Sequence, residues 1–251
     1  MRKKWLSSPI VTAALFAVAA GLILYGGIKG AAAAPRVLST FYGVQVTLDD
    51  IDVALTESNS DVAPSSAVEV HGDGTDGGVP LLQNLLAEGE DFLVGKTYTE
   101  KIAVRNTQNV LNDEGTESEG NIIKEYVRVT VYKYWVRTNE DGTVSKAMDL
   151  NPDYIKLGFV TGKGWNEDLD SKTSERRVFY WDGIVEPQGN TDYLTDTLSI
   201  DPAVLDDPAY KNATFRIMAE VDAVQTHNAK DAMTSAWGKS DMINVGADAE
   251  D

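Results

Sequence analysis

Residues 126–136 carry the most regular pattern in the chain. Apolar residues occupy every second position from Val127 to Trp135, with Lys133 as the one interruption of the apolar face. A repeat of two residues places alternate side chains on opposite faces of a β-strand, whereas a helix needs a repeat of 3.6. The segment therefore predicts a long strand with one face in a hydrophobic core.

Five more segments have strand character: 97–106, 154–160, 177–181, 193–200 and 214–224. In the last one, Phe215, Ile217 and Ala219 share one face, and Arg216 and Met218 share the other. No regular helices connect these segments, and parallel strands would need such crossovers. We therefore predict an all-β fold, an antiparallel jelly-roll-like sandwich that forms a single domain over residues 35–251.

Helical signals are few and short. Leu81, Leu82, Leu85 and Leu86 recur at helical spacing and predict a short helix, and residues 228–238 predict a last helix between an Asn cap and a Gly stop. These signals add only a few short helices to the predicted β domain.

Turns and loops separate the predicted strands. Asn151 and Asp201 each precede a proline, which is typical of one-turn helices, and Gly142 closes a predicted turn. Residues 58–78 and 108–120 are rich in Ser, Asp, Glu and Gly and predict long acidic loops, and residues 240–251 predict an acidic tail.

The N-terminal segment has the order of a secretory signal. Three basic residues lie within the first four, residues 9–28 are almost wholly apolar, and alanines 31–34 precede Pro35. We predict that residues 1–34 are a signal peptide cut by a signal peptidase near Ala33 and Ala34, so that the protein is secreted. The alternative is an uncleaved membrane anchor, because the apolar run is about as long as one bilayer-spanning helix.

A second alternating segment follows the predicted cut. Val44, Val46 and Leu48 alternate with polar residues, and the apolar set then moves to odd positions after Asp49 and Asp50. A strand cannot keep its faces through such a shift, so we expect a bulge or a break at the two aspartates.

Charge and cysteine content exclude several classes of function. The chain has 39 acidic and 22 basic residues, a formal net charge of −17, and five of the basic residues lie in the first 36. Nucleic acid is therefore excluded as a partner, and contact with a membrane is expected only through the N-terminal signal. The absence of cysteine excludes disulfides, thiol nucleophiles and thiolate metal sites.

The sequence offers little for catalysis. His71 and His227 are the two histidines, and they are far apart and outside any metal-binding or nucleophile motif. Adjacent acidic residues such as Asp206 and Asp207 are expected on solvated faces in so acidic a chain. We therefore predict no enzyme activity, no catalytic residues and no cofactor.

One loop has the oxygen-rich character that calcium prefers. Asp73 and Asp76 lie in a Gly-rich stretch, but the spacing and terminal Glu of an EF-hand are absent. A plain loop is the main prediction, with a calcium site at Asp73 and Asp76 as the alternative.

Aromatic residues near 132–135, 165 and 180–181 allow two interpretations. They could form a platform for sugar, or they could pack in the core and in cross-strand pairs. We expect the core for most of them.

Two sequence blocks resemble one family. The stretch Gly95 to Thr107 with Glu125 to Tyr132, and the closing block from Ala219 to Gly238, are similar to TasA/camelysin-type exported proteins of Gram-positive bacteria. Members of this family carry a signal read by a dedicated peptidase of the SipW type. The resemblance implies a jelly-roll sandwich, export to the cell surface and, in the best-known members, assembly into biofilm matrix fibres.

Assembly in that family implies strand donation by the segment that follows the signal. On this chain the donor would lie within residues 35–55, with Val44, Val46 and Leu48 as the assembly strand. We therefore expect a secreted structural or interaction protein of the cell surface or matrix, whose partners are further copies of itself or other surface proteins. The alternatives are a surface adhesin or glycan-binding sandwich and, with less support, a camelysin-like metallopeptidase.

Overall fold

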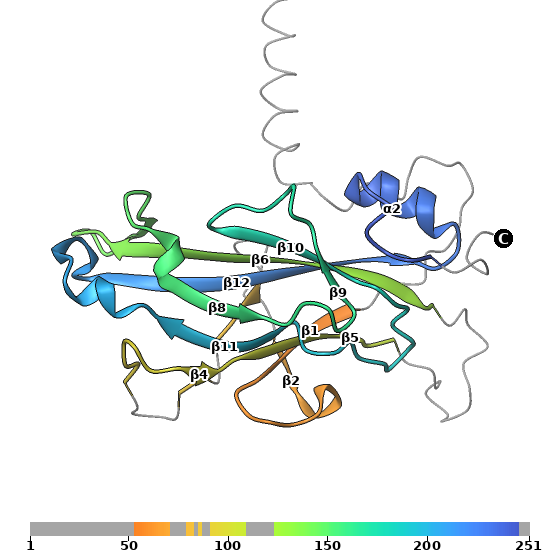
Figure 1. The fold of residues 1–251 in the computed structure, drawn as a ribbon, viewed down its shortest axis with the longest axis horizontal. Helices are drawn as coiled ribbons and strands as arrows, with labels where there is room; N and C mark the ends of the chain where they lie inside the picture. Colours follow the sequence, from red (N-terminus) through yellow and green to blue (C-terminus); the bar gives the residue numbers. More distant parts are fainter. Residues whose placement is uncertain (1–52, 71–78, 83–84, 87–90, 109–122, 246–251) are drawn as a thin grey trace, which may run out of the picture. The chain divides into compact units, whose positions relative to one another are not determined.

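The computed structural model describes residues 53–70, 79–82, 85–86, 91–108 and 123–245 (Figure 1). The chain divides into two compact units, residues 1–47 and 48–251, and every described residue belongs to the second. The described residues are mostly β-strand in antiparallel sheets, with one α-helix among them. The predicted all-β, antiparallel fold class is therefore confirmed at this level.

The larger sheet is built around two long strands, β6 (Glu125–Thr138) and β12 (Ala213–Gln225). They pair along their whole length, and their alternating apolar residues face the core. The other strands extend this sheet in the order β3-β12-β6-β10-β9, with β7 on the end of β6: β3 (Val79–Pro80), β10 (Arg176–Trp181), β9 (Trp165–Glu167) and β7 (Val144–Lys146).

Lys133 lies on the core-facing side of β6, where the sequence shows an interruption. Its Nζ donates a hydrogen bond to the Ile155 carbonyl oxygen at 2.8 Å and lies 3.8 Å from the Asp153 carboxylate. Burial lowers the pKa of Lys133, and the neighbouring Asp153 opposes that shift. The chain thus accommodates a cation on the apolar face by giving it a backbone partner.

Two three-stranded sheets form the opposite layer, below the large sheet in Figure 1. One has the order β2 (Val68–Val70), β1 (Val53–Ser58) and β5 (Lys101–Asn106). The other has the order β4 (Tyr98–Thr99), β11 (Thr195–Ile200) and β8 (Ile155–Phe159). The predicted strand 97–106 is therefore two strands with different partners, divided at Glu100.

Threonine hydroxyls join these two sheets. The backbone N–H of Ile102 donates to Thr195 Oγ1 and that of Val104 donates to Thr191 Oγ1, both at 3.0 Å. The Thr195 hydroxyl in turn donates to the Glu100 carbonyl oxygen at 2.8 Å. Each hydroxyl thus accepts where a strand carbonyl would, so buried backbone groups stay paired across the junction.

The main core lies between the two layers. It contains Leu55, Ile102 and Val104 from one side and Val129 and Phe179 from the other, among other buried residues. A second apolar cluster lies where α2 (Ala229–Trp237) covers the large sheet, and contains Tyr126, Val178, Tyr180, Val224, Ala229, Met233, Trp237 and Ile243.

Short 3-10 helices begin where proline follows an acceptor side chain. The side chains of Asn151 and Asp201 accept hydrogen bonds from the backbone N–H two residues on, as predicted, in η2 (Pro152–Tyr154) and η3 (Pro202–Leu205). Asp207 caps η4 (Pro208–Tyr210) in the same way, which the sequence analysis missed.

Three local predictions need correction. The leucines at 81–86 form no helix in their described part, because the Leu81 N–H donates to the Ile217 carbonyl of β12 and Leu82 has a left-handed φ of +77°. The predicted loop 58–78 contains η1 (Pro64–Ser66) and β2, because β2 pairs with β1. The tail after residue 240 packs through Ile243, which is 5% exposed, and the Asn244 N–H donates to Asp182.

The last helix lies where the sequence predicts it, but its N-terminus is not capped as predicted. α2 occupies the predicted range and ends at Gly238, whose φ is +72°. Asn228 is the N-cap residue in position, but it has a left-handed backbone, and its side chain makes no capping hydrogen bond.

Candidate functional site

The predicted site residues lie outside the described residues. Ala33, Ala34, Val44, Val46 and Leu48 precede residue 53, and Asp73 and Asp76, the calcium candidates, lie in 71–78, as does His71. The shift at Asp49 and Asp50 and nearly all of the predicted loop 108–120 are outside too. His227 is described, is exposed and directly precedes the N-cap of α2.

The outer edge of β12 is one candidate interaction surface. On one side β12 pairs with β6 over its whole length, and on the other it pairs with β3 only at Met218 and Ala219 within the described residues. The Leu81 N–H donates to the Ile217 carbonyl at 3.1 Å, so the backbone groups of odd-numbered residues point to this outer edge. Unpaired backbone groups of this kind are a template for strand addition.

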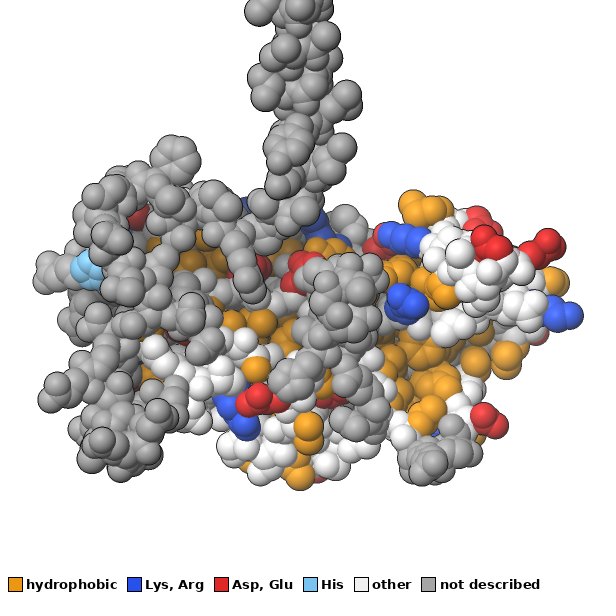
Figure 2. Space-filling view, turned by 180° about the vertical axis from the view of Figure 1, so that it is seen from behind, with side chains coloured by type: hydrophobic (Ala, Val, Ile, Leu, Met, Phe, Trp, Pro, Cys, Tyr) orange, Lys and Arg blue, Asp and Glu red, His pale blue; other side chains and the backbone are white. Residues whose placement is uncertain are grey.

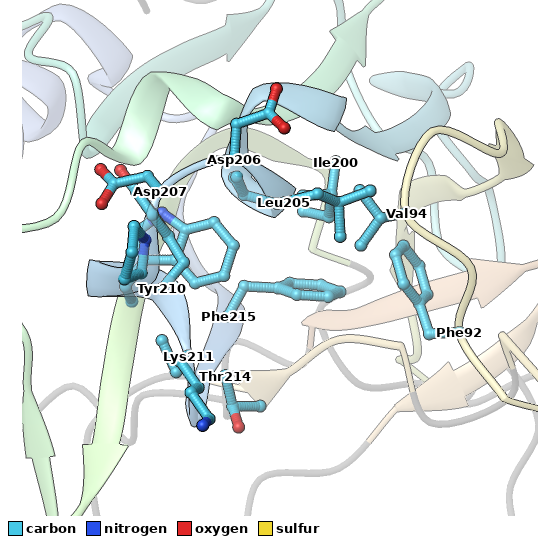
Figure 3. Close-up of a pocket in the computed structure, with 14 residues that line it drawn as sticks. Phe92, Val94, Ile200, Leu205, Asp206, Asp207, Tyr210, Lys211, Thr214 and Phe215 are labelled. Atoms are coloured by element: carbon cyan, nitrogen blue, oxygen red, sulfur yellow. The ribbon is translucent and has the colours of Figure 1, made fainter.

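An apolar groove of about 520 Å³ adjoins the start of this edge. Its walls include Phe92, Val94, Ile200 and Tyr210, and Phe215 projects into it from β12 (Figure 3). The Phe92 and Phe215 ring centroids are 5.0 Å apart. Seen from behind, hydrophobic side chains gather at the end of the face away from α2 (Figure 2).

The groove floor is held rigidly. The rings of Trp135 and Tyr210 meet edge to face with centroids 5.0 Å apart. The Trp135 indole N–H donates to the Asn151 carbonyl oxygen, and the Asn151 N–H donates to the Tyr210 hydroxyl oxygen at 2.8 Å. Burial raises the pKa of Tyr210. The groove is therefore a pre-formed, mostly apolar depression with several aromatic walls, as binding sites for apolar groups usually are.

The groove rim carries charge and exposed apolar surface. Asp206, Asp207 and Lys211 surround the opening, and Leu205 is 71% exposed. Because Asp207 already caps η4, its carboxylate is held in place rather than mobile.

Most of the aromatic side chains that could have formed a sugar platform are in the interior. Trp135, Trp165 and Tyr180 are at most 5% exposed. Trp165 meets Trp181 edge to face, with centroids 5.4 Å apart. Tyr132 and Tyr134 lie on the opposite face of the sheet, where their hydroxyls contact side chains of β12. The glycan-binding alternative thus gains no exposed aromatic platform from these residues.

A pair of buried carboxyl groups lies between the layers. Glu57 lies in β1 and is 2% exposed, and Glu100 directly precedes the adjacent strand β5 and is 0% exposed. Burial, the charge of the nearby Glu57 and a side-chain hydrogen bond with Glu57 together raise the pKa of Glu100 to about 10. Glu57 Oε1 accepts a hydrogen bond of 2.5 Å from the Leu82 N–H, and Leu82 has a left-handed φ of +77°.

Sequence reasoning missed this pair. Glu57 and Glu100 are far apart in the sequence and meet only through the pairing of β1 with β5, so acidic residues that are sequence neighbours do not indicate them. Glu57 pairs with Ile102, and Glu100 is two residues before Ile102, which places both carboxyls on one face of the strands. The usable signal was an acidic residue at a core-facing position in each of two alternating segments.

The described residues contain neither a metal-binding cluster nor a membrane-spanning helix. No group of three or more His, Asp or Glu side chains comes together there in a metal-binding arrangement. Within the same residues, no helix is both long and apolar enough to cross a membrane.

Comparisons with known proteins gave no match: no family model, no curated protein and no solved structure is similar to this chain at a significant level.

Proposed function

We propose that the chain is a secreted structural or interaction protein of the cell surface that self-associates by strand addition. In this proposal residues 44–48 of one copy pair with the outer edge of β12 of a second copy, near the aromatic groove. The observation that carries the proposal is the long β12 edge, which β3 covers over only two residues within the described chain.

The alternation of the donor segment suits this edge. In an added strand Val44, Val46 and Leu48 would share one face, and that face would lie toward the groove walls at Phe215 and Phe92. Burying three aliphatic side chains would contribute about 1.5–3 kcal/mol each before the entropy of association is subtracted.

The start of β1 limits where the donor can lie. Val53–Ser58 pairs with both β2 and β5, and Leu55 is 1% exposed in the core of the same chain. Residues from 53 onward are therefore needed for the fold itself. The donor has to lie before residue 53, within 35–52.

The resemblance to TasA/camelysin-type proteins supports the same proposal. Its implied features, a jelly-roll sandwich, export by a SipW-type signal and fibres in a biofilm matrix, form one consistent function with strand donation. An all-β antiparallel body is compatible with that family fold.

The proposal is tested by comparing two forms of the protein, one beginning at Pro35 and one at Asp50. We expect sedimentation velocity and electron microscopy to show oligomers or fibres of the longer form and monomers of the shorter form. Beginning at Asp50 keeps β1, so both forms should fold and give the same circular dichroism spectrum.

Point variants separate donor and acceptor. Val44→Asp with Val46→Asp should abolish assembly, whereas the matched change of Gln45→Asp with Thr47→Asp on the other face should have little effect. On the acceptor side Leu205→Asp should weaken assembly, and Leu169→Asp, which is equally exposed but remote from the groove, should not. Monomeric behaviour of the Pro35 form under all conditions would refute strand donation.

A further inference from the structure

The side of β3 that faces away from β12 lacks the backbone donor that a further strand would need. The Leu81 N–H donates to the Ile217 carbonyl, and Pro80 lies opposite Met218 of β12. Because backbone groups alternate along a strand, the nitrogen of residue 80 points away from β12, to the side where a third strand would have to pair. Proline has no N–H, so the first donor for such pairing is absent.

The next donor along the chain is already bound. The Leu82 N–H, two positions after Pro80, donates to Glu57 Oε1 at 2.5 Å. Leu82 also has a left-handed φ of +77°, which turns the chain out of the extended conformation and ends the segment that could pair. Neither position 80 nor position 82 therefore has a donor for an incoming strand.

The buried acid pair keeps Glu57 available as that acceptor. With a pKa of about 10, Glu100 holds its proton at neutral pH, and the side-chain hydrogen bond between the two groups uses that proton. Glu57 Oε1 is then left to accept from Leu82. Both carboxyl groups belong to residues that are at most 2% exposed, so bulk water does not compete for these hydrogen bonds.

The edge of β12 beside β3 is different. Ala213 and Phe215 come before the stretch that β3 and Leu81 cover, and their backbone groups point to the same outer edge as those of Ile217. In the described part of the chain no backbone group pairs with them on that side. This is also the end of β12 at which Phe215 projects into the groove (Figure 3).

We propose that β3, with Leu81 and Leu82, is an edge guard: it closes the centre of the β12 edge to further strands and leaves residues 213–216, beside the groove, as the place where a second copy adds its strand. Sheets in known proteins protect their edges in the same two ways, with proline and with charged side chains turned inward. One donor per edge favours linear fibres over a sheet that widens from copy to copy. The inference rests on the proposed self-association for the identity of the donor, whereas the closed edge does not depend on it.

The test adds the missing donor. The full-length chain is kept in a mild detergent, so that the apolar residues 9–28 do not drive association, and carries Val44→Asp with Val46→Asp to disable the proposed donor. In this background Pro80→Val should let β3 of two copies pair about position 80 through two backbone hydrogen bonds. We expect the dimerisation constant from sedimentation equilibrium to rise at least about 10-fold.

Two further variants control for the substitution itself. Pro80→Ala adds the same N–H with a smaller side chain and should give a similar rise, so the answer does not depend on the folding of one variant. Pro64→Val adds an N–H at the start of η1, outside β3, and should leave the dimerisation constant unchanged.

The role of the acid pair has its own readout. Glu57→Leu with Glu100→Leu removes both buried acids together and with them the acceptor of the Leu82 N–H. Amide hydrogen exchange at Leu82, measured by NMR, should then speed up at least about 10-fold. In the matched control, Glu57→Gln with Glu100→Gln, the amide oxygen at position 57 still accepts from Leu82, and the exchange rate should stay the same.

Two results would overturn the proposal. The first is Pro80→Val and Pro80→Ala chains that fold like the unmodified chain by circular dichroism and are as monomeric as Pro64→Val. The second is assembly of the unmodified chain that slows amide exchange at Leu81 and Leu82 and not at residues 213–216. Failure of the proposed function looks different, because the unmodified chain would then stay monomeric while Pro80→Val still dimerised.

Discussion

Thr195→Val tests whether side-chain hydroxyls hold the two small sheets together. Thr195 is 0% exposed, and Val has nearly the same shape, so packing should survive the change. The substitution removes the acceptor of the Ile102 N–H and the donor to the Glu100 carbonyl. Two buried backbone groups would then lack partners.

The expected cost follows from those two groups. Leaving one buried polar group unpaired costs about 1–3 kcal/mol, so Thr195→Val, which leaves two, should lower the free energy of unfolding by about 2–6 kcal/mol. Thr191→Val removes only the acceptor of the Val104 N–H and should cost about half as much.

Urea unfolding followed by tryptophan fluorescence measures the effect. With an m-value of about 2 kcal/mol/M, the midpoint of Thr195→Val should fall by about 1–3 M. Thr197→Val is the matched control, because its hydroxyl donates only to the exposed side chain of Asp196, and it should change stability by less than about 0.5 kcal/mol. A free energy of unfolding for Thr195→Val within about 0.5 kcal/mol of that of the unmodified protein would refute the reasoning.

Two further predictions concern strain and pH. Gly164→Ala should lower the melting temperature more than Gly142→Ala. Both glycines have φ above +80°, but only at Gly164 would the added Cβ meet another side chain, the Trp181 ring. Equal losses of melting temperature in the two variants would contradict this. Burial opposes ionisation of Asp168, but Lys239 and Ser171 outweigh it and lower the pKa of Asp168. This carboxylate therefore stabilises the fold above the unfolded pKa of about 4 and loses its effect as the pH falls toward the lower folded pKa. The melting temperature of Asp168→Asn should accordingly fall less between pH 6 and pH 3 than that of the unmodified protein, and parallel curves would exclude this role.

The two long strands and two of the short 3-10 helices could be predicted from the sequence, because residues close together in the chain determine them. The alternation in β6 and β12 and the proline-bounded caps at Asn151 and Asp201 follow from backbone periodicity and from hydrogen bonds two residues apart. β2 was missed because three residues within a Ser- and Asp-rich stretch become a strand only by pairing with β1.

The candidate sites depend on long-range contacts and were not predictable in the same way. The groove brings Phe92 together with Phe215, and the acid pair brings Glu57 together with Glu100. Neither pairing has a signature in the spacing of residues along the chain, because strand order and register decide it.

The position of β1 also has a mechanical consequence. β1 pairs with β5 from Val53 to Ser58 and with β2 over Leu55 to Glu57, so it is held on one side from its first residue and on both sides from Leu55. Tension applied through residue 53 along the strand axis would load these hydrogen bonds together in shear, instead of opening them one after another. An assembly linked through that segment would therefore transmit a pulling force into β1, where hydrogen bonds to both neighbouring strands share it.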